Sequence, residues 1–335
     1  MRIGVALPHY DFSLPGGAPI TFEAVAEVAC RAERLGFHSV WMSDHFFASL
    51  ERYGGGAERY GTLEPIVTLG ALATMTERVR LGTLVLSGGF RHPAVLAKSA
   101  TAIDRLSGGR FELGLGAGWY EEEFDAFGVP FGTVGERFAR LEETLGYLDA
   151  LFGAEPARFD GERFELRDAF NRPPPIQQPR PPLLVGGKGG PRLLRLAARY
   201  ADGWNGAWRW TVQAYAVRAA AAREACERQG RDPAGFRLSL GLYTMVGKDR
   251  SDLARRWELA RSRLPPGVAD AVGLDVLRSE GLAGTPEEVL ERLEAFAALG
   301  VSELIVCPAP VWFAMPDPSM LDLLAETVLP AARGL

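Results

Sequence analysis

The segment from Val79 to Trp119 constrains the fold more than any other part of the chain. Its first residues, VRLGTLVL, form an apolar run without helical periodicity, which predicts a strand. The next stretch, HPAVLAKSATAIDRLSGG, starts near a proline and ends on two glycines, so it predicts a helix, and RFELGLGAGW predicts a second strand. A strand–helix–strand unit of this length joins two parallel strands by a right-handed crossover.

The same alternation runs through the whole chain, and it predicts an α/β protein with the (β/α)8 TIM barrel fold. The first strand–helix turn lacks the G-x-G-x-x-G that opens a doubly wound dinucleotide-binding sheet. We expect one domain over residues 1–335. Strands are expected at 3–7, 39–42, 79–86, 110–119, 182–185, 201–205, 236–246 and 301–307, and helices at 22–35, 65–75, 93–106, 136–152, 191–200, 213–229, 286–299 and 321–329.

The length beyond a minimal barrel falls mainly into three insertions, at about 46–63, 154–182 and 248–284. The second contains ARFDGERFELR, which predicts a short pair of strands. Long loops of a barrel more often serve function than not. We therefore expect these insertions at the C-terminal face of the barrel, where such folds bind their ligands.

Composition excludes several classes of protein. The formal charge of -5 and the absence of long Lys or Arg runs argue against nucleic-acid binding. No apolar run reaches the ~20 residues of a membrane span, and no signal sequence is recognisable at the start, so we expect a cytoplasmic protein. Cys30, Cys226 and Cys307 are too widely spaced for a metal pair or a disulfide framework and are expected to be buried free thiols.

Histidines gather after the predicted strand ends. His9, His45 and His92 follow strands one, two and three, whereas His38 begins strand two and is expected to be structural. His45 follows Asp44 and is the best candidate for proton transfer, although a hydrogen-bonded structural histidine is the alternative for each. The chain has no H-x-H or H-x-x-x-H pair, so no metal site is predicted.

Two glycine-rich turns end strands four and five. Glycines let backbone N–H groups approach an anion and a helix start favours negative charge, so the second turn predicts a phosphate site, with a plain tight turn as the alternative. In the first turn small residues would let a flat ligand lie against the backbone, and Trp119 could stack on that ligand or pack in the core. The two turns are Gly116, Ala117, Gly118 and Trp119, and Gly186, Gly187, Lys188, Gly189 and Gly190.

Several longer motifs resemble those of the bacterial luciferase-like monooxygenase superfamily, and within it the coenzyme F420-dependent oxidoreductase branch. They include RHPAVLAKSATAIDRLSGGRFELGLGAGW, EEEFDAFGVPF, PPLLVGGKGGPRLLRLAARYADGWN and GTPEEVLERLEAFAALGVSELIV. The resemblance covers nearly the whole chain. It implies a barrel with a flavin or deazaflavin lying across its carboxyl-end face.

The resemblance also implies roles for individual residues. A bulge with a non-proline cis peptide at Leu84-Val85, in the same GTLVLS segment as Ser87, would back the ring of the cofactor. Asp44 and His45 are the expected catalytic residues: Asp44 would lie near the cofactor head, where it would also bind the cofactor, and His45 near the reacting centre. The loop from Gly186 to Gly190 would bind the phosphate, and the turn from Gly116 to Trp119 would shape the edge of the ring.

One position departs from the family pattern. In the sugar-phosphate dehydrogenase branch a glutamate stands where this chain has Trp119, so sugar-phosphate oxidation is not expected. Glu121, Glu122 and Glu123 follow closely and could compensate. However, acidic residues at a helix start are more often solvated, and that interpretation is favoured.

The resemblance implies hydride transfer between coenzyme F420 and an unidentified small organic substrate, with His45 moving the accompanying proton. Two alternatives stay open: an FMN-dependent two-component monooxygenase that uses reduced flavin and oxygen, and a non-catalytic luciferase-like subunit. A reductase that supplies reduced flavin or F420 is a possible partner. A homodimer through the helices at 65–75 and 93–106 is also expected.

Overall fold

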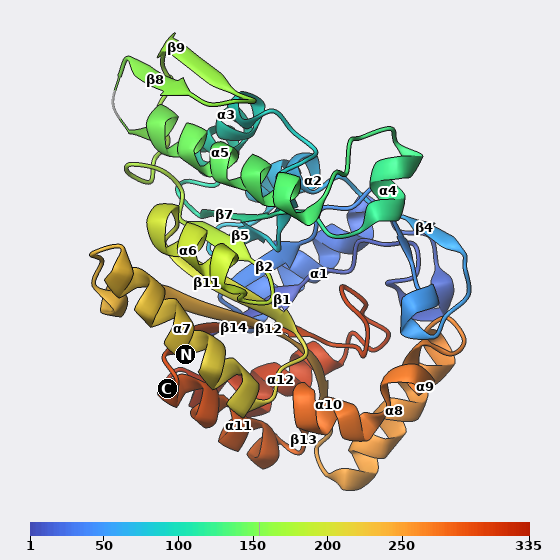
Figure 1. The fold of residues 1–335 in the computed structure, drawn as a ribbon. Coiled ribbons are helices and arrows are strands. Elements are labelled where there is room, and N and C mark those ends of the chain that lie inside the picture. The colour runs from blue at the N-terminus through green and yellow to red at the C-terminus, as the bar shows by residue number, and fades with distance from the viewer. Residues whose placement is uncertain (154) are drawn as a thin grey trace.

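Eight parallel strands pair side by side and close into a ring, which confirms the predicted (β/α)8 barrel (Figure 1). The computed structural model describes residues 1–153 and 155–335. β14 pairs with β1 and β10 pairs with β7, so the ring has no free edge. In ring order the strands are β1 (Arg2–Ala6), β2 (Ser39–Met42), β5 (Arg80–Thr83), β7 (Phe111–Gly116), β10 (Leu183–Gly186), β11 (Gly203–Trp208), β12 (Arg237–Val246) and β14 (Val301–Cys307).

Helices follow the strands and surround the ring (Figure 1). Their bounds lie within about two residues of those predicted, because caps visible in the sequence set them. The Thr21 hydroxyl accepts the Ala24 amide at the start of α1, and Gly36 ends that helix in the left-handed conformation. These helices are α1 (Phe22–Leu35), α2 (Pro65–Met75), α3 (Pro93–Leu106), α5 (Val134–Phe152), α6 (Pro191–Tyr200), α7 (Val212–Arg228), α11 (Pro286–Ala298) and α12 (Met320–Thr327), and α13 (Leu329–Ala332) follows α12.

The third predicted strand, at 79–86, is two strands rather than one. β5 ends at Thr83 and β6 (Leu86–Ser87) resumes after a cis peptide between Leu84 and Val85. At the break the Thr83 hydroxyl accepts the Gly114 amide at 2.8 Å and lies 3.0 Å from the Gly114 carbonyl, to which it can donate. A side chain therefore satisfies backbone groups that an unbroken strand would have paired, which periodicity alone does not reveal.

The insertions supply the structure beyond the minimal barrel. Residues 46–63 form an antiparallel pair of strands with a short helix between them, and β8 and β9 confirm the predicted strand pair within 155–182. Residue 154, predicted to begin that second insertion, lies outside the described residues. The added elements are η1 (Pro15–Gly17), β3 (Phe47–Ser49), η2 (Glu51–Tyr53), β4 (Arg59–Gly61), α4 (Glu121–Ala126), β8 (Ala157–Asp160), β9 (Glu165–Ala169), η3 (Pro233–Gly235), α8 (Arg250–Arg263), α9 (Val268–Val272), α10 (Leu274–Glu280) and β13 (Leu282–Gly284).

The two ends of the molecule differ. α4, β4, α8 and α9 gather at one end, whereas both chain termini lie at the other (Figure 1). The first end is where the barrel strands finish, so the insertions at 46–63 and 248–284 surround the carboxyl ends, as the sequence predicts. The same expectation is wrong for the second insertion, because it follows α5 and leads into β10: its Gln177 side chain donates to the Phe111 carbonyl at the start of β7 at 2.8 Å, which places it at the amino ends of the strands. None of the helices in the described ranges has the length and hydropathy needed to cross a bilayer.

A buried ionic network fills the opposite, amino-terminal end of the barrel. Arg237 donates to Glu112 at 2.8 Å and to Glu303 at 3.1 Å, and Arg80 donates to Glu112 at 2.5 Å. Burial opposes the charged form of Glu112, but Arg237 and Arg80 outweigh it and lower the pKa of this carboxyl group. Burial and the charge of Glu112 raise the pKa of Glu303. Arg237 is thus the shared counter-charge of two carboxylates within the barrel.

Replacing Arg237 with Leu should destabilise the fold by about 3–5 kcal/mol, because it leaves Glu112 and Glu303 buried without their shared partner. The free energy of unfolding in urea measures this loss. Arg158→Leu is the matched control, since Arg158 pairs with Asp168 at the surface and is 75% exposed; its effect should stay within about 0.5 kcal/mol. Equal effects of the two substitutions would contradict a structural role for the network.

Candidate active site

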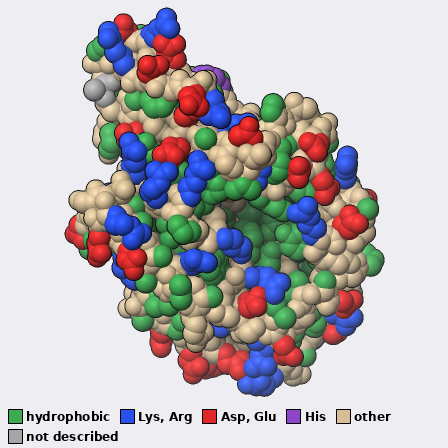
Figure 2. All heavy atoms as spheres, viewed as in Figure 1, with side chains coloured by type: hydrophobic (Ala, Val, Ile, Leu, Met, Phe, Trp, Pro, Cys, Tyr) green, Lys and Arg blue, Asp and Glu red, His purple; other side chains and the backbone are tan. Residues whose placement is uncertain are grey.

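A cavity of about 540 Å³ opens among the carboxyl ends of the strands. Figure 2 shows a hollow with hydrophobic side chains in its walls and Lys and Arg side chains around it. Gly189 and Gly190 lie outside the cavity lining: Gly189 packs on Trp204, and Gly190 caps the start of α6. The other predicted site residues all line this one cavity: Asp44, His45, Leu84, Val85, Ser87, Gly116, Ala117, Gly118, Trp119, Gly186, Gly187 and Lys188.

The glycines at the ends of β7 and β10 make room for Val85. A Cβ atom on Gly116 would lie 2.9 Å from the Val85 side chain, and one on Gly186 would lie 2.6 Å from it. Both separations are shorter than any normal contact, so neither position accepts a side chain while Val85 stays in place. The sequence-based interpretation of Gly116, as clearance for a flat ligand, and that of Gly186, as part of an anion-binding turn, both leave out this contact with Val85. These glycines allow Val85 to form an aliphatic wall of the cavity.

His45 is held by a buried carboxylate that the sequence interpretation placed in solvent. The Glu123 side chain is 2% exposed, and its Oε1 lies 2.8 Å from His45 Nδ1. Its second oxygen accepts the Phe46 amide at 2.8 Å. The preference for a solvated Glu123 at a helix start is wrong: α4 turns this residue inward, whereas Glu121 is exposed. In the sequence, the only signal that could have indicated an inward-facing Glu123 is its position as the third glutamate of the EEEF run.

The contact with Glu123 fixes which ring nitrogen of His45 carries the proton and which one faces the cavity. A carboxylate accepts, so Nδ1 carries the proton of the neutral ring and Nε2 is left as the proton acceptor. Within the described residues Nε2 has no hydrogen-bond partner. Trp119 meets the ring edge-on with 5.7 Å between ring centres. Trp119 is 48% exposed, which excludes the core-packing alternative for this residue.

Asp44 is an anchor between strand ends. Arg91 donates to both of its oxygens, at 2.6 and 2.9 Å, and the Ser87 amide donates to Oδ2 at 2.8 Å. Arg91 also pairs with Glu64. Burial opposes the charge of Arg91, but these two carboxylates outweigh it and raise the pKa of Arg91. Because its oxygens are engaged, Asp44 is suited to fix the end of β2 against β6 rather than to carry a proton.

A second histidine forms a directed chain of hydrogen bonds beside the cavity. His9 Nδ1 lies 2.8 Å from the Leu7 carbonyl oxygen and must donate to it, so His9 Nε2 accepts from the Ser43 hydroxyl at 3.0 Å. The Ser43 oxygen, 2.5 Å from the Tyr10 hydroxyl, then accepts from Tyr10. Burial lowers the pKa of His9 to about 3, so the ring is neutral near pH 7. The chain rigidifies the wall that Ser43 contributes to the cavity.

Two cations lie at the cavity. The Arg209 guanidinium pairs with Glu280 at 2.6 Å, whereas Lys188 has no carboxylate partner within the described residues. The Lys188 ammonium lies 5.3 Å from the centre of the Trp210 ring. Burial and the charge of Arg209 lower the pKa of Lys188. A cation in the cavity lining without a carboxylate partner among the described residues, just before the start of α6, favours binding of an anion there.

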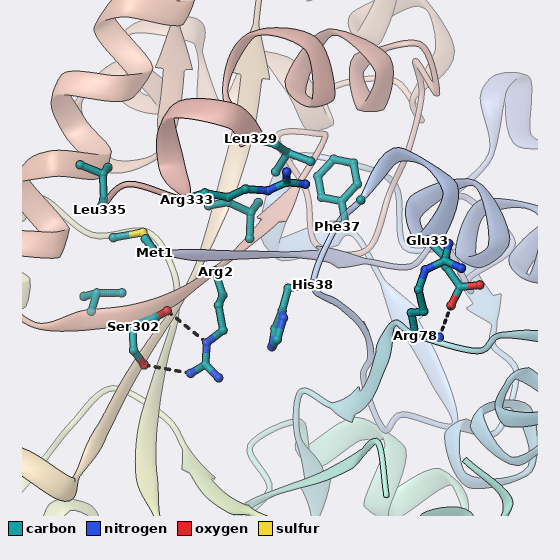
Figure 3. A pocket seen from close by; sticks show the side chains of 13 residues that line it. Met1, Arg2, Glu33, Phe37, His38, Arg78, Ser302, Leu329, Arg333 and Leu335 are labelled. Atoms are coloured by element: carbon teal, nitrogen blue, oxygen red, sulfur yellow. Dashed lines mark hydrogen bonds between the residues drawn. The ribbon is translucent and has the colours of Figure 1, made fainter. Parts of the chain in front are cut away.

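The remaining histidines and the cysteines lie away from the cavity. His92 caps α3 by accepting the Ala94 amide at 3.2 Å. His38 lines a separate hollow of about 610 Å³ at the amino ends of the strands, together with Arg2, Arg78 and Arg333 (Figure 3).

Among residues 1–153 and 155–335 no cluster of three His, Cys, Asp or Glu side chains could hold a metal. The free cysteines are Cys226 and Cys307, which are buried, and Cys30, which is partly exposed.

The fold and the site define a TIM barrel with a cofactor-sized cavity at its carboxyl-end face. The family model of the luciferase-like monooxygenases matches residues 1–303, and this chain belongs to that family. A relative from Beutenbergia cavernae, an F420-dependent glucose-6-phosphate dehydrogenase, is 31% identical over 90% of this chain and 91% of its own length.

Two further comparisons extend this result. Another F420-dependent glucose-6-phosphate dehydrogenase, from Amycolatopsis mediterranei, is 37% identical over 54% of this chain. The match covers 52% of the length of that relative. A solved F420-dependent secondary alcohol dehydrogenase, in complex with an F420–acetone adduct, has a TM-score of 0.78 at 22% identity and covers 99% of both chains. At that identity the likeness shows a common fold.

The stability of the protein should fall between pH 7 and pH 4 partly because of His9. Its pKa is depressed from 6.5 to about 3 on folding, so the unfolded chain takes up a proton below pH 6.5 that the folded chain refuses until about pH 3. The His9 contribution at pH 4 is on the order of 3 kcal/mol. Urea unfolding of the wild type and His9→Asn at both pH values isolates it. An identical pH dependence in the two proteins would exclude a neutral buried His9.

Proposed function

We propose that the protein transfers a hydride between coenzyme F420 and a small organic substrate. The observation that carries this proposal is the single cavity that joins His45, held by Glu123, to the unpaired cation Lys188 across the aliphatic wall of Val85. The names of two curated relatives support F420 over other cofactors.

The residues present fit a deazaflavin with an anionic tail. Val85 and the backbone of the adjoining glycines provide a smooth apolar surface against which a flat ring can pack. Lys188 and the free amides at the start of α6 would hold the negatively charged part. When bound, the deazaflavin supplies hydride chemistry at its ring. The protein provides binding, orientation and the matching proton transfer.

His45 is the residue that we assign to proton transfer. Its Nε2 atom is the available acceptor, and the Glu123 carboxylate stabilises the ring in either protonation state by accepting from Nδ1. When an alcohol is oxidised, Nε2 takes the hydroxyl proton; in the reverse direction the protonated ring returns it to the carbonyl oxygen. Glu123 is a positioning residue because it acts through His45.

Two other functions are compatible with the family. An FMN-dependent monooxygenase would use the same cavity, and the family name itself includes monooxygenases. A non-catalytic subunit would have no need of the intact Glu123–His45 pair or of a Lys188 without a carboxylate partner in the described residues, which speaks against it.

Two proposals concern partners. One is a reductase that supplies reduced cofactor. The other is a homodimer through α2 and α3, on which Val67 and Val95 are 73% and 57% exposed.

Cofactor choice can be tested by titrating the purified protein with F420 and with FMN and following fluorescence. F420 should bind, and Lys188→Met should weaken its binding by about tenfold or more, because the anionic tail loses its counter-charge. Lys98→Met is the control, since Lys98 lies on the exposed face of α3 and should leave binding unchanged. Tight binding of FMN with none of F420 would favour the monooxygenase instead.

The role of Glu123 has a readout that needs no known substrate. In the wild type, ¹⁵N NMR of the imidazole should show the Nδ1–H tautomer of His45, whereas Glu123→Gln should give a mixture, because the amide can also donate. F420 affinity should stay unchanged in the variant, and with any substrate that the wild type turns over, turnover should fall on the order of a hundredfold. Glu121→Gln, on the exposed side of the same helical turn, should change neither property. Loss of F420 affinity in Glu123→Gln would mean a structural role.

A further inference from the structure

We infer that the substrate of this cavity is an uncharged alcohol or ketone with an apolar body, and that phosphate esters and carboxylates are excluded. The inference rests on the proposed F420 chemistry. It concerns the half of the cavity that faces Val85, and three features of that half support it: the aromatic wall, the pairing of its charges and the position of His45.

An aromatic wall stands across the barrel from Val85. Trp208 at the end of β11 stacks on Tyr243 of β12, with ring centres 5.8 Å apart and planes 7° apart. Phe313, in the loop after β14, meets Trp208 edge-on at 5.1 Å. In the ring of eight strands β12 is the fourth from β5 in either direction, so these rings face the wall formed after β5. The rings enclose a flat apolar space.

The aromatic wall continues outward to the rim of the cavity. Tyr53 of η2 lies against Trp312 with ring centres 4.4 Å apart, and Trp312 packs edge-on against Tyr10 at 6.1 Å. Residues from the first insertion and from the loop after β14 thus extend one surface. A ligand in this half would exchange water for aromatic faces and edges, which favours apolar groups.

The charged side chains around this half are already paired. Asp44 is engaged by Arg91, Glu123 by His45, and Arg209 by Glu280. Lys188 is the cation in the described lining without a carboxylate partner, and it lies beside the start of α6, where the cofactor anion would compete for it. A substrate phosphate against the aromatic wall would lose its hydration without gaining a counter-charge, which is costly.

The polar contacts available to such a substrate come from uncharged groups or from the His45 ring. His45 lines the same cavity: its Nε2 accepts from a hydroxyl when the ring is neutral and donates to a carbonyl oxygen when the ring is protonated. The buried Trp312 Nε1–H in the aromatic wall also has no partner among the described residues. A few uncharged hydrogen-bonding groups in a largely apolar cavity suit a hydroxyl or carbonyl oxygen on an apolar body. Two relatives are named for glucose 6-phosphate, a phosphate ester, whereas the described lining of this cavity offers no cation without a carboxylate partner beyond Lys188.

A matched pair of probes tests the inference. The F420 complex of the full chain is titrated with cyclohexanol and with trans-4-hydroxycyclohexanecarboxylate, which differ by one charged group, and with glucose 6-phosphate; binding is followed by tryptophan fluorescence. Cyclohexanol should bind at least about tenfold more tightly than either anion. Tyr53→Lys, at the half-buried rim, should raise affinity for the carboxylate by about tenfold, whereas Tyr53→Phe should leave the preference unchanged.

The outcomes separate the two levels of proposal. Normal F420 binding with tighter binding of either anion, or with no saturation by cyclohexanol, overturns the substrate class alone. Failure of the protein to bind F420 overturns the proposed function and the substrate class with it. A preference for cyclohexanol over the carboxylate that Tyr53→Lys narrows by about tenfold, and that Tyr53→Phe leaves unchanged, supports both.

Discussion

The close approach of Val85 to the glycines of β7 and β10 is the contact on which the site depends. Cβ atoms at Gly116 and Gly186 would fall less than 3 Å from the valine, so both strands must end in glycine for the chain to turn inward after β5. This turn splits one predicted strand into β5 and β6 and gives the cavity its aliphatic wall. The Ser87 amide, just beyond the turn, then reaches Asp44 and ties β6 to β2.

Buried charged groups are paired at both ends of the barrel, but the pairing is less complete at the carboxyl end. At the amino end Arg237 neutralises Glu112 and Glu303, and this pairing stabilises the interior of the barrel. At the carboxyl end most charges are also paired, but the pairing leaves His45 Nε2 and the Lys188 ammonium available. Groups left without a partner in an otherwise satisfied site are the ones able to meet a ligand. The difference between the two ends separates stability from function in this chain.

The fold was predictable because its signals are local. Proline and threonine starts and glycine ends define helices such as α1 and α11, and the apolar strands between them fix the alternation. The position of the cavity followed from the rule that parallel strands bind ligands at their carboxyl ends. The inward turn of Glu123 was missed because three adjacent glutamates look alike in sequence. Only the direction of α4 distinguishes them, and tertiary packing sets that direction.

A crystal structure of the protein with F420 would test the central claim most directly. We expect the deazaflavin ring against Val85, its anionic tail at Lys188 and the start of α6, and His45 Nε2 facing the space between the ring and the aromatic wall of Trp208 and Tyr243. Density for the cofactor elsewhere, for instance in the basic hollow around Arg2 and Arg333, would contradict this assignment of the site.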